Sequence, residues 1–165
     1  MKQLVISLLI LGGAARSPVS ADCQRPRMPQ APFSLADVVF RGTVRDIRNI
    51  TTQRGYQNIT PRGTEYHATR GYTIVSFDVS RVWKGSAGSR FALHMAWGTP
   101  LDGMYMFRRD TEYLVFAQKN DAALAARAGL IGVRFTASSC GGTGPTSYES
   151  SANYLRFLGL GRPPG

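Results

Sequence analysis

Three segments of the chain alternate apolar and polar residues, and this period of two limits the fold more than any other feature does. They are residues 37–47 (DVVFRGTVRDI), residues 72–85 (YTIVSFDVSRVWKG) and residues 90–97 (RFALHMAW). Such alternation predicts strands that bury one face and expose the other. The positions expected to face the core are Val38, Phe40, Gly42, Val44, Val75, Phe77, Val79, Trp83, Phe91, Leu93, Met95 and Trp97.

Two further strands and one helix complete the expected fold. Residues 112–118 (EYLVFAQ) are apolar throughout, which predicts a strand covered on both faces, and residues 130–136 (LIGVRFT) are a fifth candidate. Near the C-terminus, a helical spacing that stops at Gly159 is shown by Tyr148, Ala152, Leu155 and Leu158. The sequence therefore predicts a mainly β fold: a five-stranded, OB-fold-like closed barrel with a C-terminal α-helix. A β-sandwich fits less well, because sandwiches usually need about seven strands.

The N-terminus has the features of an export signal. A lysine at position 2 precedes the apolar run 4–15, and Val19-Ser20-Ala21 supplies small residues for cleavage after Ala21. The run is too short to span a bilayer, and no later segment approaches the roughly 20 apolar residues that a membrane helix needs. We expect residues 1–21 to be a signal peptide and the mature protein to be exported, to the periplasm or the extracellular space.

The remaining residues are enough for one domain, expected to span residues 22–160, with residues 161–165 as a flexible tail. Residues 22–33 contain three prolines and are expected to be extended. Removal of Lys2 and Arg16 lowers the net charge by two, from +10 to +8. A basic exported monomer is suited to acidic polysaccharides, membrane headgroups or acidic protein surfaces. Nucleic acid is a disfavoured partner in that compartment.

The chain has two cysteines, Cys23 and Cys140, and the export signal predicts that they form a disulfide bond. Besides a disulfide bond, the sequence around Cys140 suggests two possible functions. As a nucleophile, Cys140 would need a nearby base, and the only histidines are His67 and His94. As a phosphate-binding loop, the glycines at 141, 142 and 144 lack the lysine of a Walker motif. A turn into a helix capped by Thr146 or Ser147 is the simpler interpretation.

No other residues suggest catalysis or a cofactor. Glu65 and His67 could pair as metal ligands, with His94 as a third, but their spacing matches no zinc motif. No set of residues supplies a nucleophile, a base and a stabilising group together. We therefore expect a non-enzymatic protein that binds no metal and no cofactor.

A polar segment between the first two predicted strands carries the most distinctive surface chemistry. An Arg-Gly pair recurs every eight residues, at Arg54, Arg62 and Arg70. Arg48 and the tyrosines Tyr56 and Tyr66 add charge and stacking faces to the same segment. One interpretation is a projecting β-hairpin whose arginines are merely solvated. The other is a contact surface for a protein or a polyanion, since the first long connection of an OB-fold commonly contributes to binding.

The order of three motifs resembles a known family. VFRGTV (39–44), FDVSRVWKG (77–85) and YLVFA (113–117), followed by a cysteine and a terminal helix, are similar to netrin-like modules. They resemble above all bacterial proteins similar to tissue inhibitors of metalloproteinases. The resemblance covers roughly residues 23–158 and implies an OB-fold barrel that is tied at its N-terminus by a disulfide bond.

The same resemblance implies a candidate mechanism at the N-terminus. Inhibitors of this family chelate the zinc of a metalloprotease through the free amine and carbonyl of a first-residue cysteine. This sequence differs, because cleavage after Ala21 makes Asp22 the first residue and Cys23 the second, followed by Gln24 rather than the Cys-x-Cys pattern. Asp22, Cys23 and Gln24 are the candidate protease contacts. The expected function is thus a secreted binding module, with a zinc metalloprotease or another protein as partner; the alternative is a glycan-binding module that uses residues 48–72.

Overall fold

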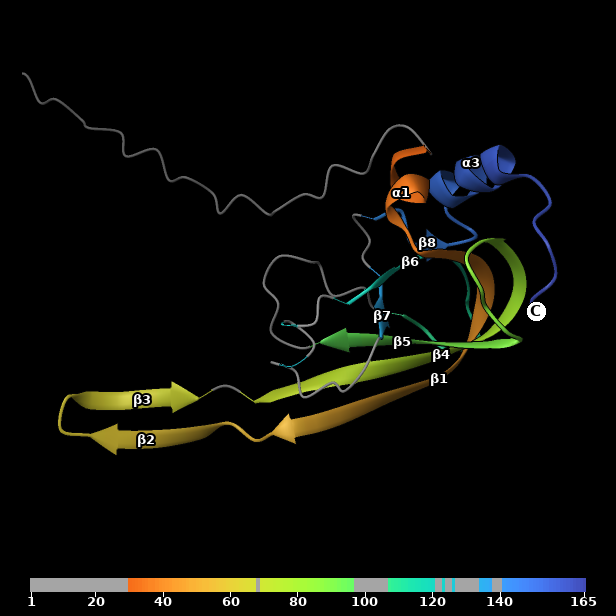
Figure 1. The fold of residues 1–165 in the computed structure, drawn as a ribbon. Coiled ribbons are helices and arrows are strands. Elements are labelled where there is room, and N and C mark those ends of the chain that lie inside the picture. The colour runs from red at the N-terminus through yellow and green to blue at the C-terminus, as the bar shows by residue number, and fades with distance from the viewer. Residues whose placement is uncertain are drawn as a thin grey trace, which may run out of the picture.

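A computed structural model describes residues 30–67, 69–96, 107–120, 123, 126, 134–137 and 141–165 of the chain. The fold is mainly β with a helix near the C-terminus, as predicted (Figure 1). In chain order the elements are α1 (Gln30–Leu35), β1 (Val38–Gln53), β2 (Tyr56–Thr60), β3 (Gly63–His67), β4 (Arg70–Lys84), β5 (Arg90–Ala96), β6 (Glu112–Lys119), β7 (Phe135–Thr136), β8 (Gly144–Pro145) and α3 (Glu149–Leu158).

The main sheet has the strand order β5-β4-β1-β6-β7, with β8 paired to β6, while β2 and β3 form a separate two-stranded sheet. All pairs are antiparallel. The hydrogen-bonded path is open among the described residues, so the prediction of a closed barrel is not met there. The two end strands nevertheless meet through side chains: the Phe91 and Phe135 ring centroids are 5.1 Å apart, and Thr136 Oγ1 lies 3.4 Å from Met95 Sδ. Since β7 has only two residues, it offers few backbone groups for a ladder.

The predicted alternation in β1, β4 and β5 is confirmed by the buried face of the sheet. Phe40, Val44, Val75, Phe77 and Leu93 are all at most 1 % exposed and belong to one core cluster. β6 is buried on both faces, also as predicted, because the residues from Tyr113 to Ala117 are all buried. Aromatic rings fill this core and meet edge to face around Phe77.

The expected position of Trp83 is wrong, and a bulge explains why. Gly42 pairs with Val79 but Arg41 pairs with Arg81, which leaves Ser80 as an extra residue on β4. An extra residue reverses which side chains face the core beyond it. Val82 is therefore fully buried with the first cluster, and Trp83 packs against a second cluster on the opposite face.

The two helices cover that second cluster, which contains Val39, Leu114, Phe116 and Tyr154 (Figure 1). Residues 30–33, expected to be extended, form the first part of α1 instead. The start of a helix tolerates proline, and Pro32 is the third residue of α1. The element α3 ends before Gly159, as predicted.

Two details of the predicted terminal helix differ. The buried residues of α3 are Ser151 and Tyr154, whereas Ala152 is exposed and Tyr148 is half-exposed. The N-cap residue is Tyr148, which makes no side-chain capping bond. Thr146, the expected cap, instead donates its hydroxyl proton to the Glu112 carboxylate. A long-range contact has thus replaced the local one.

Residues 161–165, expected to form a flexible tail, follow the edge of β4. Val82 and Arg162 exchange two backbone hydrogen bonds of 2.9 Å, and the Gly165 N–H donates to the Ala87 carbonyl at 3.1 Å. The pairing is available because β5 covers β4 only from Tyr72 to Asp78, which leaves the backbone of Val82 unpaired on that side.

Candidate functional site

The polar segment between the first two predicted strands forms a projecting ribbon. We call residues 54–69 the arm; it contains β2 and β3 and extends away from the rest of the protein (Figure 1). β1 and β4 remain paired as far as Gln53 and Arg70, and the arm continues from Tyr56 opposite His67 to Thr60 opposite Gly63. The Gly55 N–H donates to Thr69 Oγ1 at 3.0 Å and joins the two sides at the base.

The described side chains of the arm form no core. The residues from Thr51 to Ile59 and from Pro61 to Glu65 are all exposed, and among the described strands none pairs with β2 or β3 to form a third member of this sheet. Isolated two-stranded ribbons are only marginally stable in water. The arm is therefore held by continuity with the β1–β4 pair and by its own turn, in which Thr60 Oγ1 donates to the Gly63 carbonyl at 2.9 Å.

Three predicted arginines lie at two separate places on this ribbon. Arg54 and Arg70 lie at the base, and Arg62 lies in the turn at the tip. Their guanidinium groups are exposed and make no hydrogen bond or ion pair with the described residues. The five residues of β2 separate base from tip by about 17 Å. The arginines cannot converge on one small anion, but they can contact an extended partner at two points.

The other predicted contact residues have different surroundings. Arg48 lies on β1 before the arm, and its Nε is 3.2 Å from the Asp46 carboxylate, so its charge is partly neutralised. Tyr56 is 53 % exposed and Ile59 is 85 % exposed, which gives the arm an aromatic and an aliphatic contact group. Tyr66 lies on β3, but its side chain is outside the described residues. Arginine and tyrosine are enriched in the centres of protein interfaces.

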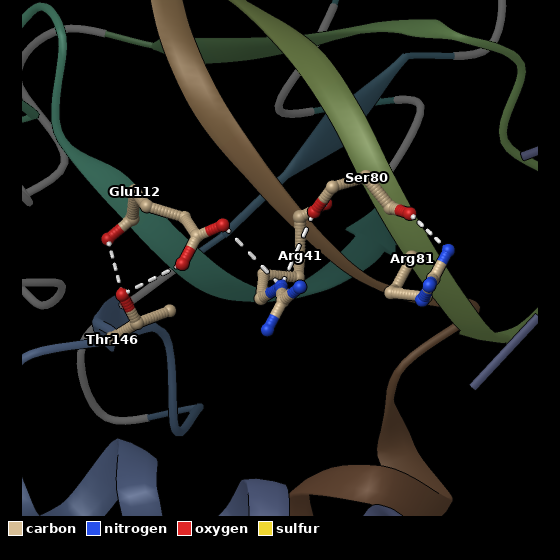
Figure 2. A network of polar contacts seen from close by, with 5 residues as sticks. All are labelled: Arg41, Ser80, Arg81, Glu112 and Thr146. Atoms are coloured by element: carbon tan, nitrogen blue, oxygen red, sulfur yellow. Dashed lines mark hydrogen bonds and ion pairs between the residues drawn. The ribbon is translucent and has the colours of Figure 1, made fainter. Parts of the chain in front are cut away.

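A polar network lies on the main sheet, close to the N-terminal end of α3 (Figure 2). The sequence did not predict this network. Arg41 Nε lies 3.3 Å from the Glu112 carboxylate and donates to Ser80 Oγ at 3.2 Å. Glu112 in turn accepts a hydrogen bond of 3.0 Å from Thr146 Oγ1. The network joins β1, β4, β6 and the turn before α3. We interpret the network as structural, because its polar groups form hydrogen bonds and an ion pair with one another.

Several predicted residues cannot be placed. Asp22, Cys23, Gln24 and Cys140 all lie outside the described residues, so the disulfide bond and the protease contacts stay predictions. Gly142 has φ +89°, and an added Cβ would approach Pro32 and the Phe116 ring to 3.1 and 3.3 Å. Glycine at this position is therefore explained by packing, without a phosphate.

The histidine on β5, His94, has a buried Nδ1 with no hydrogen-bond partner among the described residues. His94 lies on the face of β5 opposite the core, with its ring 6.0 Å from that of Tyr72. Burial, followed by the charge of Arg134, lowers the pKa of His94 from its ordinary value, so the ring is neutral at pH 7. Among the residues that the structure describes, no three His, Cys, Asp or Glu side chains group as a metal site would require.

Within the described ranges, none of the helices has both the length and the apolar character needed to cross a bilayer. Comparison with protein-family models and with curated proteins found no match to the chain.

Proposed function

We propose that this protein is an exported, non-enzymatic binding module that contacts its partner through the arm. The observation that carries the proposal is the arm itself, a ribbon in which residues 54–59 and 61–65 are exposed and no described side chain is buried. Exposed Arg54, Arg62, Tyr56 and Ile59 provide both charge and apolar contact. These residue types at the end of a rigid support suit recognition of another molecule better than stabilisation of the fold.

The fold that we assign to this module is a partly open OB-fold barrel. Its support is the strand order, in which β1 is central and the path ends at β5 and β7. The contact between Phe91 and Phe135 brings these two ends together. A sheet whose end strands meet in this way encloses one core, as a small barrel does.

A protein partner is favoured by the resemblance to netrin-like modules and metalloproteinase inhibitors, and a zinc metalloprotease is the first candidate. The proposed contact uses the arm, because a mature chain that starts at Asp22 has no free amine on Cys23 for zinc chelation. Mass spectrometry of the exported protein identifies this first residue. A start at Cys23 would restore the chelating mechanism, in addition to the contact through the arm.

Shortening the arm tests the proposal. Gln53 and Arg70 are paired, so residues 54–69 can be replaced by Asn-Gly, a two-residue hairpin turn that preserves this register. We expect inhibition of a collagenase-type zinc endopeptidase to weaken at least about tenfold. The melting temperature should stay close to that of the parent chain, because β2 and β3 form a separate sheet. Unchanged inhibition by the shortened protein would contradict a role for the arm.

A polyanion is the second candidate partner, favoured by Arg54 and Arg62 of the arm and Arg70 at its base, whose guanidinium groups have no partner among the described residues. We expect the triple variant R54A/R62A/R70A to elute from heparin at lower salt. The slope of log affinity against log salt should fall by about one for each lost contact.

The matched control for this experiment removes three exposed arginines elsewhere, in the variant R81A/R108A/R156A. Both triple variants have the same net charge, so only a site on the arm makes them differ. Equal retention of the two variants would show that heparin responds to net charge alone and would exclude the arm as its site. If neither heparin nor the endopeptidase binds the parent chain, the proposed function itself is contradicted.

A further inference from the structure

A depression of about 330 Å³ lies on the solvent-facing side of the β1–β4–β5 sheet, before the base of the arm. Its polar and small lining residues are Arg45, Asp46, Ser76, Asp78, Arg90 and Ala92. None of these residues belongs to the arm, and none was predicted as a site residue. The volume is within the range of small-molecule sites.

Two features of the sequence produce this depression. Asp46, Ser76 and Ala92 are paired side by side across the three strands, so two of the three side chains in this row are small. Beside this row, Val44 pairs with Phe77 and Asp46 with Ser76, which leaves Arg45 as a bulge residue on β1. A bulge redirects the side chain of its extra residue. Without the extra residue Asp46 would share the core face of Val44; with it, Asp46 faces solvent beside Arg45 and both line the depression.

Positively charged groups outnumber negatively charged groups around the depression. Asp46 is held by Arg109 Nη2 at 2.6 Å and by Arg48 Nε at 3.2 Å. Asp78 lies 4.0 Å from Arg90 Nε, with both side chains largely exposed. Four guanidinium groups thus surround two carboxylates, and the Arg45 guanidinium makes no hydrogen bond or ion pair with the described residues. The excess of positive charge favours an anionic ligand.

The depression also offers hydrogen-bond acceptors as well as donors. The Ser76 hydroxyl has no hydrogen-bond partner among the described residues, and the Asp78 carboxylate is only loosely paired. A bare inorganic anion would use the arginines but would give no hydrogen bond to the Ser76 hydroxyl and no donor to the loosely paired Asp78 carboxylate. A ligand that combines one negative group with several hydroxyls satisfies all of them, and this combination is typical of an acidic sugar.

We propose that this depression binds one acidic sugar unit. The carboxylate or sulfate of the sugar pairs with Arg45, and its hydroxyls donate to Asp78 and exchange a hydrogen bond with Ser76. The unit could be a free sugar acid or one residue of an acidic polysaccharide, because both present the same group. The inference does not rest on the arm, since no arm residue lines the depression.

An NMR titration of the ¹⁵N-labelled full chain without its signal tests the proposal. The probes are glucuronate, a glucuronate-containing tetrasaccharide, neutral glucose and inorganic sulfate. We expect shifts with either acidic sugar in the amides of residues 45–48, 76–78 and 90–92, and none with glucose. The tighter of the two sugars identifies the free or the polymeric source. Equal shifts with sulfate, or shifts confined to residues 54–69, would overturn the proposal.

Two variants separate charge from shape. Arg45→Gln is expected to weaken binding about tenfold or more, because it removes a charge-assisted hydrogen bond. Ala92→Leu fills the depression without changing any charge and should weaken binding by a similar factor. The control Arg62→Gln removes an equal charge at the tip of the arm and should bind glucuronate unchanged. If Arg45→Gln binds as the parent does, the assignment is wrong, whatever the arm proves to bind.

Discussion

Replacing Phe77 by alanine is expected to lower the free energy of unfolding by about 3–5 kcal/mol. Phe77 is 1 % exposed and lies on β4, the central partner of β1 and β5. Its ring centroid lies 5.4 Å from those of both Phe40 and Phe107, with the rings edge to face. Alanine would leave a cavity among these rings, because neighbours fixed in a sheet can relax only partly.

Denaturant unfolding followed by circular dichroism measures this change. The control is Phe157→Ala, which removes the same side chain from α3, where it is 46 % exposed. A surface change of this kind is expected to cost less than about 1 kcal/mol. A loss below about 1 kcal/mol for Phe77→Ala would contradict the core described above. Equal losses for the two variants would do the same.

Strands β1, β4 and β5 were predictable because each one buries a single face over most of its length. From Phe40 to Val44 of β1 and from Val75 to Val79 of β4 the buried positions recur every second residue, and a local pattern is enough to show this. β6 was predictable for the opposite reason, since a strand covered on both faces is apolar throughout. These properties belong to single strands and need no knowledge of their partners.

The bulges were not predictable, because a bulge belongs to a pair of strands. Ser80 is an extra residue only relative to β1, and Arg45 only relative to β4. Each bulge changes where the following side chains point. This is why Trp83 lies against the helices rather than in the first core cluster, and why the depression at Arg45 was missed.

The candidate site also has features that the sequence predicts and features that it does not. The arm was recognisable from its repeated Arg-Gly pairs and its lack of apolar periodicity. The distance between base and tip depends on the pairing of β2 with β3, so the separation of the arginines could not be predicted. The ion pair that partly neutralises Arg48 was also hidden, although its partner Asp46 is only two residues away.

The Trp-Lys-Gly motif, on which the resemblance partly rests, has a structural role in this chain. The Trp83 indole donates to the Gly159 carbonyl at 3.1 Å, directly after α3. The Lys84 ammonium donates to the Phe33 and Ser34 carbonyls at 2.9 and 3.0 Å, near the end of α1. The end of β4 therefore fixes both helices on the same face of the sheet, and the motif by itself identifies no binding site.

Gly85, the last residue of this motif, is expected to be the most sensitive glycine. It has φ +68°, and an added Cβ would lie 2.4 Å from the Asp37 carbonyl oxygen and 3.0 Å from Val38 Cγ2. The contacts are with Asp37, directly before β1, and with Val38, its first residue, and the Asp37 backbone cannot move aside without disturbing the sheet. We expect Gly85→Ala to lower the free energy of unfolding by at least about 3 kcal/mol, from the unfavourable φ and the steric conflict together.

The variant Gly85→Asn separates these two causes. Asparagine tolerates positive φ much better than alanine does, but it carries the same Cβ. Because the carbonyl contact involves Cβ, we expect the asparagine variant to be destabilised almost as strongly as the alanine variant in thermal and denaturant unfolding. An asparagine variant close to the parent chain would show that backbone conformation alone requires glycine. The close approach of β1 to the end of β4, and with it the placement of α1 by Lys84, would then be wrong.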